Sequence, residues 1–285
     1  MEDRELIFFT NLAGARTHYY HFLLGIFVPL MRHLSFRDRN KIDTKFAVLS
    51  CGPLDTILAE LSADIIALDA GLFHQAISEK RQKGHAIQRY LGNDNIFHYN
   101  QMAFSLAAEF AYDRLRDRIA IARQRLDKIW DADHEKILVI ARGSPNKFYI
   151  ERGESTGSLR RAVPNLDVVT GCLENAVLVE LEGMSLSEQI AHFSEADVVI
   201  AQHGAALANM IWCKKAALVM EIKPSYLVGG DVFEVLTRTQ GVNYCAVRQE
   251  HWHAPVSDPE MQLLRSFLLE RRQPSQSFPA NSTIS

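Results

Sequence analysis

The hydrophobic positions of the first half form short runs separated by segments with helical spacing. Leu6–Thr10, Lys45–Ser50 and Asp64–Leu68 are rich in aliphatic and aromatic residues and have the length of buried strands. Between them, Thr17–Leu34 and Leu54–Leu61 carry apolar residues at helical spacing. Strands that alternate with helices in this way predict a parallel sheet in an α/β domain.

A long helical pattern over Met102–Trp130 follows, and its second part carries many charges. We interpret it as a solvated amphipathic helix rather than a partner-binding helix. A new strand pattern begins soon after it, at Ile137–Ala141. The long helix is therefore expected to link two domains, the first of which covers residues 1–133.

The second half repeats the alternation of strands and helices. The predicted elements are the strands Ile137–Ala141, Ala176–Leu181, Ala196–Ala201 and Ala217–Ile222, and the helices Arg160–Leu173, Ser185–Ser194 and Ala206–Lys215. Residues 143–158 are rich in Gly, Ser, Asn and charge and are expected to form a loop. Ser185 and Glu188 have the spacing of a capping box. Together these patterns predict a doubly wound α/β sheet over residues 134–257.

The sequence predicts neither a secretory signal peptide nor a membrane-spanning segment. The N-terminus has no basic segment that leads into an apolar one, and the longest apolar run, Phe22–Met31, is too short to cross a bilayer. A cytoplasmic protein is expected, with a peripheral position at an inner membrane as the alternative. Residues 258–272 are expected to form a terminal helix that packs back on the first domain, and the Pro/Ser-rich residues 273–285 a disordered tail.

Composition narrows the class of protein further. The 285 residues are 47% hydrophobic and 23% charged, which is typical of a globular protein. With 31 basic and 34 acidic residues, the net charge of −3 argues against a strongly basic nucleic-acid-binding protein. The 4 cysteines lie far apart in the sequence, which indicates reduced thiols rather than a disulfide framework or a zinc site.

The segment Ala196–Pro224 carries the clearest chemical signal. A buried strand runs into His203-Gly204-Ala205-Ala206, and a helical pattern follows directly. Small side chains let a ligand approach the backbone, and the first N–H groups of a helix attract phosphate. Such turns lie beyond the carboxyl ends of the strands, where doubly wound sheets bind ligands. The segment predicts a pyrophosphate site; the alternative is a tight connection that only packs against the sheet.

Three arginines add to this prediction. Arg142 directly follows the strand Ile137–Ala141 and so lies at the same edge of the sheet. Arg160 and Arg161 begin the next predicted helix, where two cations are unfavourable unless an anion is bound. Guanidinium groups bind phosphate through paired hydrogen bonds. The alternative is that all three arginines are ordinary surface residues.

These motifs, taken in order, resemble the C-terminal domain of the family 61 glycosyltransferases. The matching residues are Arg142, Arg160 to Asn165, Ser187 to Ile190, Ala196-Asp197, His203 to Asn209 and Glu221. Tyr19 to Leu23 are similar to an aromatic-rich motif near the start of that family. The sequence departs from the family at Leu166, where the family usually has Glu, and at Ala206, where it usually has Gly.

The resemblance implies a GT-B-like α/β fold, in which two Rossmann-like doubly wound domains face a cleft. It implies an inverting glycosyltransferase of the hexosyl- or pentosyltransferase class, which transfers sugar from a nucleotide-sugar in the C-terminal domain to a glycan or glycoconjugate of polysaccharide or lipopolysaccharide type. No cofactor or nucleic-acid partner is implied. The residues expected to bind substrate are Arg142, Arg160, Arg161, Asn165, Gln189, Gly204, Ala205, Ala206, Leu207, Asn209 and Glu221.

The catalytic base is expected to be a histidine, because a neutral imidazole accepts protons near pH 7. We favour His21 in the acceptor-side domain over His203, which we expect to contact the donor. Asp55 and Asp69 are further candidates. No metal is expected: Asn93–Asn95 has the composition of a turn, and His251–His253 of an exposed loop.

Two other functions remain open at the level of sequence. A pyruvyl or other group transferase could use a similar two-domain scaffold, because a fold does not determine a function. A catalytically silent nucleotide-sugar-binding protein is the third hypothesis, and Leu166 in place of Glu favours it.

Overall fold

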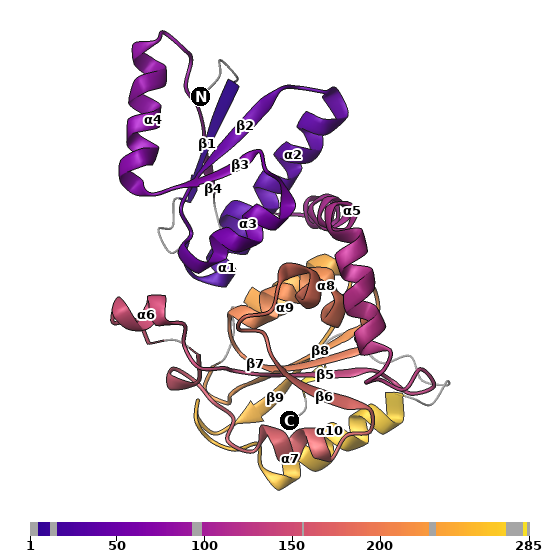
Figure 1. Cartoon of the computed structure of the whole chain (residues 1–285). Helices are drawn as coiled ribbons and strands as arrows, with labels where there is room; N and C mark the ends of the chain where they lie inside the picture. Colours follow the sequence, from indigo (N-terminus) through magenta and orange to yellow (C-terminus); the bar gives the residue numbers. More distant parts are fainter. Residues whose placement is uncertain are drawn as a thin grey trace. The chain divides into compact units, whose positions relative to one another are not determined.

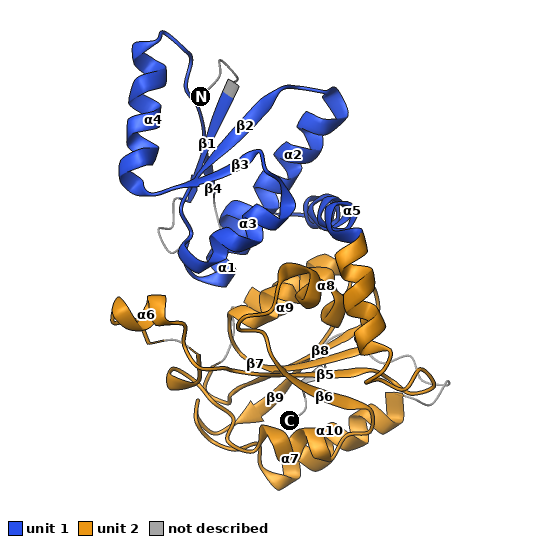
Figure 2. Cartoon of the chain, viewed as in Figure 1, with its two compact units in different colours: residues 1–116 blue, residues 117–285 orange. Residues whose placement is uncertain are grey.

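The computed structural model describes residues 5–11, 16–92, 99–155, 157–227, 232–271 and 282–283 of the chain. The chain divides into two compact units, residues 1–116 and 117–285 (Figure 2). The division falls within the long helix α5, Gln101–Leu126, whereas the sequence pattern places the boundary after this helix, at residue 133.

The first unit contains a four-stranded, fully parallel sheet in the order β3-β2-β1-β4. Its elements are β1 Glu5–Asn11, α1 Tyr19–Phe22, the π-helix Leu23–Phe27, α2 Val28–Asn40, β2 Thr44–Leu49, the 3-10 helix Gly52–Leu54, α3 Asp55–Leu61, β3 Ile65–Leu68, α4 Ala70–Gln82, β4 Gln88–Gly92 and the start of α5. Figure 1 shows α2 and α3 on one face of the sheet and α4 on the other. The three strands predicted in this half are confirmed, whereas α4 and the mostly exposed edge strand β4 carry too weak a pattern to be predicted.

The second unit contains the larger sheet, also fully parallel, in the order β10-β9-β8-β7-β5-β6. Its elements are β5 Ile137–Ala141, α6 Lys147–Glu151, the 3-10 helix Gly157–Leu159, α7 Leu166–Gly171, β6 Ala176–Glu180, α8 Leu186–Glu195, β7 Val198–Gln202, the 3-10 helix Ala205–Trp212, β8 Leu218–Pro224, α9 Val232–Gln240, β9 Asn243–Gln249, α10 Asp258–Arg271 and β10 Ser282–Thr283. Helices α8 and α9 cover one face and α7 and α10 the other (Figure 1). Both units are therefore Rossmann-like α/β structures, as predicted.

The terminal helix α10 packs within the second unit. Its Leu264 and Leu268 are buried in one cluster with Ile137 and Val139 of β5, and Arg271 donates to the carbonyl of Ala216 at 2.9 Å. The sequence-based expectation placed this helix on the first domain. The disordered tail expected over residues 273–285 lies outside the described residues except for Ser282 and Thr283, which pair with β9.

One predicted helix is much shorter than its pattern suggests. Residues 160–173 were expected to be helical, but α7 spans only Leu166–Gly171. Tertiary hydrogen bonds hold the preceding segment in a non-helical conformation, because the N–H of Ala162 donates to Trp252 at 3.1 Å and the amide of Asn165 pairs with the main chain of Val256. Pro164 also disfavours helical geometry at Val163. The expected loop over residues 143–158 contains the short helix α6, which Asn146 caps.

A close backbone contact closes the carboxyl ends of β1 and β4 in the first unit. A Cβ atom on Gly92 would lie 1.6 Å from the carbonyl oxygen of Gly25, and one on Gly25 would lie 2.2 Å from Nδ2 of Asn11. The Asn11 amide also donates to the carbonyl of His21 at 3.1 Å. The π-helix and the helix that carries His21 are thus held against these strand ends.

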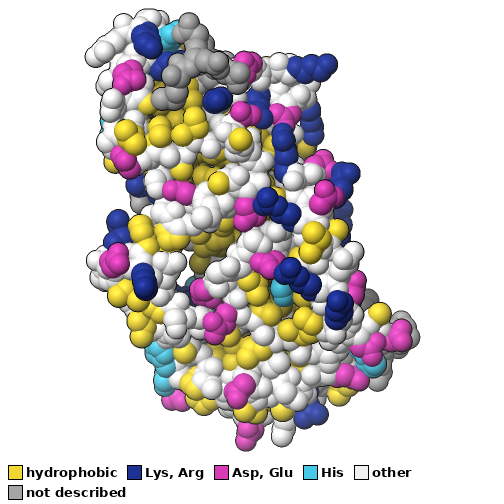
Figure 3. All heavy atoms as spheres, viewed as in Figure 1, with side chains coloured by type: hydrophobic (Ala, Val, Ile, Leu, Met, Phe, Trp, Pro, Cys, Tyr) yellow, Lys and Arg dark blue, Asp and Glu magenta, His cyan; other side chains and the backbone are white. Residues whose placement is uncertain are grey.

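The surface and the helices add two facts. On the face in Figure 3, basic and acidic side chains are interspersed. Within the described residues, no helix is both long and apolar enough to cross a membrane.

Replacing Gly92 by Ala should destabilise the protein. The added methyl group has no space beside the Gly25 carbonyl, so the free energy of unfolding should fall by about 1–3 kcal/mol. Gly171→Ala is the control, because a Cβ there meets no atom within 4 Å and alanine favours the helix. Urea unfolding followed by circular dichroism measures both. Equal midpoints for the two variants would contradict the close contact.

Candidate active site

The order of strands in the second unit creates a switch point between β5 and β7. The chain passes from β5 to β6 on one side and then returns to β7 on the other side of β5. In doubly wound sheets, ligands bind at the carboxyl ends of strands where the order reverses in this way. The residues that directly follow these two strands are Arg142 and His203.

The side chains of Arg142 and Arg161 meet at this point. Nη2 of Arg142 donates to the main-chain oxygen of His203 at 2.7 Å, and Nη1 of Arg161 donates to the same oxygen at 2.8 Å. A guanidinium group carries five N–H donors, so each arginine retains several for another partner. We call the group formed by Arg142, Arg160, Arg161, His203 and Gly204 the switch-point cluster.

Positive charge is concentrated in the switch-point cluster. Burial and the charges of Arg161 and Arg160, opposed by Glu182, lower the pKa of Arg142 to about 10. Burial and the charge of Arg160 also lower the pKa of Arg161. Among the described residues, none of the three arginines forms an ion pair with a carboxylate. An anion would therefore find both positive charge and N–H donors here.

Gly204 makes the approach of Arg142 possible. A Cβ atom at this position would lie 1.6 Å from Nη2 of Arg142, so only glycine leaves room for the guanidinium group. The next residues begin a 3-10 helix, Ala205–Trp212, and not the α-helix expected over 206–215. Side chains three residues apart are aligned in a 3-10 helix, and the Trp212 indole accordingly donates to Asn209 at 2.9 Å.

The ring of His203 is held by a buried carboxylate. Oε1 of Glu221 lies 2.5 Å from Nδ1 of His203, and the hydroxyl of Tyr244 donates to Oε2 at 2.5 Å. Glu221 is 0% exposed, and a carboxylate in such a place requires partners for both oxygens. Because the carboxylate accepts the Nδ1–H, the imidazole presents Nε2 as its other edge. Glu221 thus orients His203, a task that the sequence pattern did not distinguish from substrate binding.

Trp252 forms a further part of the site that sequence analysis missed. Arg161 lies over its ring at 4.1 Å, and its ring centroid is 5.5 Å from that of His203. The buried amide of Gln202 holds this arrangement, since it donates to the carbonyl of Trp252 at 2.8 Å and to Gln249 at 2.9 Å. His251 and His253, the neighbours of Trp252, are exposed. The described residues contain no group of three or more His, Cys, Asp or Glu that could hold a metal ion.

Four other residues named from the sequence make their contacts inside the protein. Asn165 uses both ends of its amide on the main chain of Val256, at 2.8 and 2.9 Å. Asn209 donates to Gln189 at 3.1 Å, and both side chains are buried, as is Leu207. These contacts support the turn from beneath, and direct contact with a substrate stays a prediction. Ala205 and Ala206 lie half-buried at the start of the 3-10 helix.

Leu166 belongs to the core of the second unit. It is 7% exposed and packs in the same cluster as Val169 at the start of α7. The position at which the resembling family has Glu is therefore apolar and buried in this chain.

The candidate residues of the first unit have different surroundings. His21 is half-buried in α1, and its ring lies 5.3 Å from that of Tyr20. The carboxylate of Asp55 accepts hydrogen bonds from Ser50 and from the N–H of Cys51, and Asp69 caps α4 by accepting from Leu72. These hydrogen bonds explain both aspartates structurally. Asn93–Asn95 lie outside the described residues.

The fold and site define a Rossmann-like protein with a cluster of arginines at the switch point of its second sheet. The sequence matches the model of the family Glycosyltransferase 61 over residues 19–220. The chain therefore belongs to this family, and membership implies glycosyltransferase activity. The match includes both His21 and the switch-point cluster. A search of curated proteins found no match.

Replacing Tyr244 by Phe should destabilise the second unit. The change removes a donor from a fully buried carboxylate, so the free energy of unfolding should fall by about 1–3 kcal/mol. All 3 tryptophans, Trp130, Trp212 and Trp252, lie in this unit, so urea unfolding followed by tryptophan fluorescence reports on it. Tyr226→Phe, at a 62% exposed position, is the matched control. If both variants unfold like the wild type, the Glu221 contact does not contribute to stability.

Proposed function

We propose that the switch-point cluster binds the diphosphate of a nucleotide-sugar and that the chain transfers the sugar to a glycan or glycoconjugate. One observation carries the proposal: two guanidinium groups converge on the His203 carbonyl without a carboxylate partner among the described residues. Gly204 leaves room for the Arg142 guanidinium group, and the first N–H groups of the 3-10 helix add donors for phosphate oxygens.

The proposed reaction is a single in-line displacement with inversion. A base takes the proton of an acceptor hydroxyl, whose oxygen forms a bond to the anomeric carbon of the sugar. The bond between that carbon and the diphosphate breaks, and the diphosphate leaves with the electron pair. Arg142, Arg160 and Arg161 would neutralise the charge that develops on this leaving group, so the arrangement does not require a divalent cation.

The two Rossmann-like units support a GT-B arrangement, with the donor on the second and the acceptor on the first. His203 belongs to the donor cluster, and Glu221 fixes its ring, which suits a residue that contacts the donor. His21 in the first unit is then the proposed base. The proposed acceptors are glycans of polysaccharide or lipopolysaccharide type, and the proposed location is cytoplasmic or peripheral at an inner membrane.

Titration with nucleotides tests the donor site. UDP, GDP, CDP and ADP and their sugar derivatives are compared by calorimetry, and one nucleobase should bind clearly more tightly than the others. Arg161→Gln should weaken that binding roughly tenfold or more, because a hydrogen bond to a charged group contributes about 1.5–3 kcal/mol. Gly204→Ala should weaken it as well, because the methyl group displaces Arg142.

The control is Arg265→Gln, at an exposed position on α10. Equal loss of binding in the control and in Arg161→Gln would contradict the assignment, as would the absence of binding by any nucleotide. Binding of phosphoenolpyruvate in place of nucleotides would favour a pyruvyl transferase. Nucleotide-sugar binding without hydrolysis or transfer would favour a silent binding protein.

Kinetics of two histidine variants test the roles of His21 and His203. His21→Ala should lower kcat by about 10²–10⁴-fold and remove the acidic limb of the pH profile, with donor affinity unchanged. His203→Ala should instead raise the dissociation constant of the donor. The reverse pattern would assign the base to His203.

A further inference from the structure

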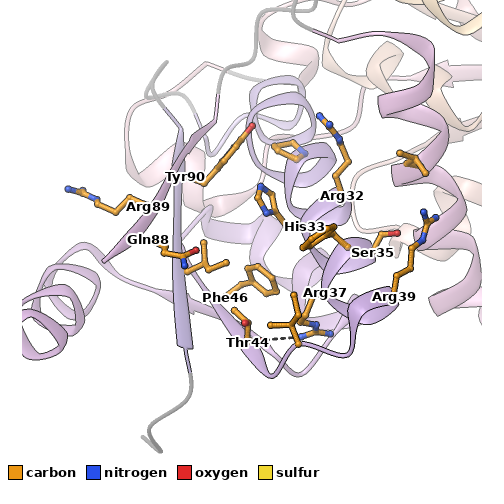
Figure 4. Close-up of a pocket in the computed structure, with 15 residues that line it drawn as sticks. Arg32, His33, Ser35, Arg37, Arg39, Thr44, Phe46, Gln88, Arg89 and Tyr90 are labelled. Atoms are coloured by element: carbon orange, nitrogen blue, oxygen red, sulfur yellow. Dashed lines mark hydrogen bonds between the residues drawn. The ribbon is translucent and has the colours of Figure 1, made fainter. Parts of the chain in front are cut away.

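The first unit contains a concave site, which is distinct from the switch-point cluster. It is a hollow of about 770 Å³, lined by α2, the three strands β1, β2 and β4, and Leu106 of α5 (Figure 4). This volume lies within the range of small-molecule sites, about 300–1,000 Å³. The strand residues Thr44, Phe46, Gln88 and Tyr90 come from the first halves of their strands, away from the carboxyl ends.

The lining of the hollow is cationic. Four of its residues are arginines and none is acidic. Arg37 is neutralised within the protein, because its guanidinium group pairs with Asp38 at 2.7 Å and with Asp64 at 2.8 Å. Arg32 and Arg39 are exposed residues of α2, and neither has an ion-pair partner among the described residues. Arg89 is directed away from the other labelled side chains in Figure 4.

The rest of the lining combines aromatic and neutral polar residues with the apolar residues Ile7, Pro29, Ile42 and Leu106. Phe46 is 1% exposed at its base, and the ring of His33 lies 5.2 Å from that of Tyr90. Burial and the charge of Arg32 lower the pKa of His33, so the imidazole is neutral near pH 7. Burial raises the pKa of Tyr90, so its phenol stays protonated. Both groups therefore offer hydrogen bonds rather than charge.

We propose that this hollow binds a saccharide that carries a carboxylate or phosphate group. Arg32 and Arg39 would hold the anionic group, the rings of Tyr90 and His33 would pack against the apolar face of the sugar, and Gln88 would bind hydroxyls. The proposal rests on the proposed function, since a glycosyltransferase requires an acceptor and the proposed acceptor side is the first unit. It specifies the acceptor class and adds a binding site remote from the strand ends.

The shape of the hollow favours a saccharide over a membrane. A membrane surface contacts protruding basic and apolar residues, whereas here Gln88, His33 and Tyr90 lie within the concave lining (Figure 4). On the face in Figure 3, positive charge is mixed with negative charge and does not form a uniformly basic surface.

Calorimetry at low salt tests the proposal with trigalacturonate and glucose 6-phosphate as anionic probes and maltotriose as the neutral probe. The anionic probes should bind, maltotriose should not, and added salt should weaken binding. Arg32→Gln combined with Arg39→Gln should weaken binding roughly tenfold or more, as expected for the loss of charged hydrogen bonds. Arg81→Gln, an exposed arginine of α4 outside the hollow, should change nothing.

Four results would overturn the proposal. They are no binding of either anionic probe, equal binding of maltotriose, an unchanged affinity in the double variant, and inorganic phosphate binding as tightly as glucose 6-phosphate. The hollow would instead be assigned to a membrane if the wild type cosediments with phosphatidylglycerol vesicles, the double variant does not, and neither binds the saccharides. Titration of the double variant with the preferred nucleotide separates failure of this proposal from failure of the proposed donor site. The double variant should bind the nucleotide as tightly as the wild type does.

Discussion

The main-chain carbonyl of His203 is the point on which the arrangement of the second unit depends. Strand order places it beside Arg142, the non-helical segment before α7 supplies Arg161, and Gly204 leaves the space that Arg142 needs. Burial and mutual repulsion oppose this concentration of positive charge, as the lowered pKa values of both arginines show. Both remain charged near neutral pH, so an anion bound between them would remove a cost that the unliganded protein carries.

The elements of the fold with strong local patterns were predictable from the sequence. The buried strand Ile137–Ala141 has the predicted bounds, and the capping box of Ser185 and Glu188 is present. Prediction failed where tertiary contacts decide the local conformation. The hydrogen bond between Ala162 and Trp252 holds a segment with a helical pattern out of the helix, and the exposed edge strand β4 lacks the apolar alternation that marks a strand.

The candidate site was predictable only in part, for a related reason. Arg142 and His203 follow predicted strands, and in a parallel sheet that position alone places them at one edge. Tyr244 and Trp252 reach the same site from β9 and the loop after it, and no local pattern indicates that they do. Glu221 is an acidic residue in an apolar strand. Only the structure shows that it is fully buried and contacts the ring of His203.

The switch points of the two sheets have different surroundings, and this difference favours different ligands for the two units. In the first unit, the chain backbone itself fills the space beside β1 and β4, since the carbonyl of Gly25 lies against Gly92. In the second unit, Arg142 follows the end of β5 and meets Arg161 at the His203 carbonyl, and each guanidinium group retains N–H donors. These free N–H donors support the proposed diphosphate site on the second sheet. The first sheet instead offers its cationic hollow on one face, between α2 and the early halves of the strands, where an anion would be held by side chains rather than by the ends of the strands.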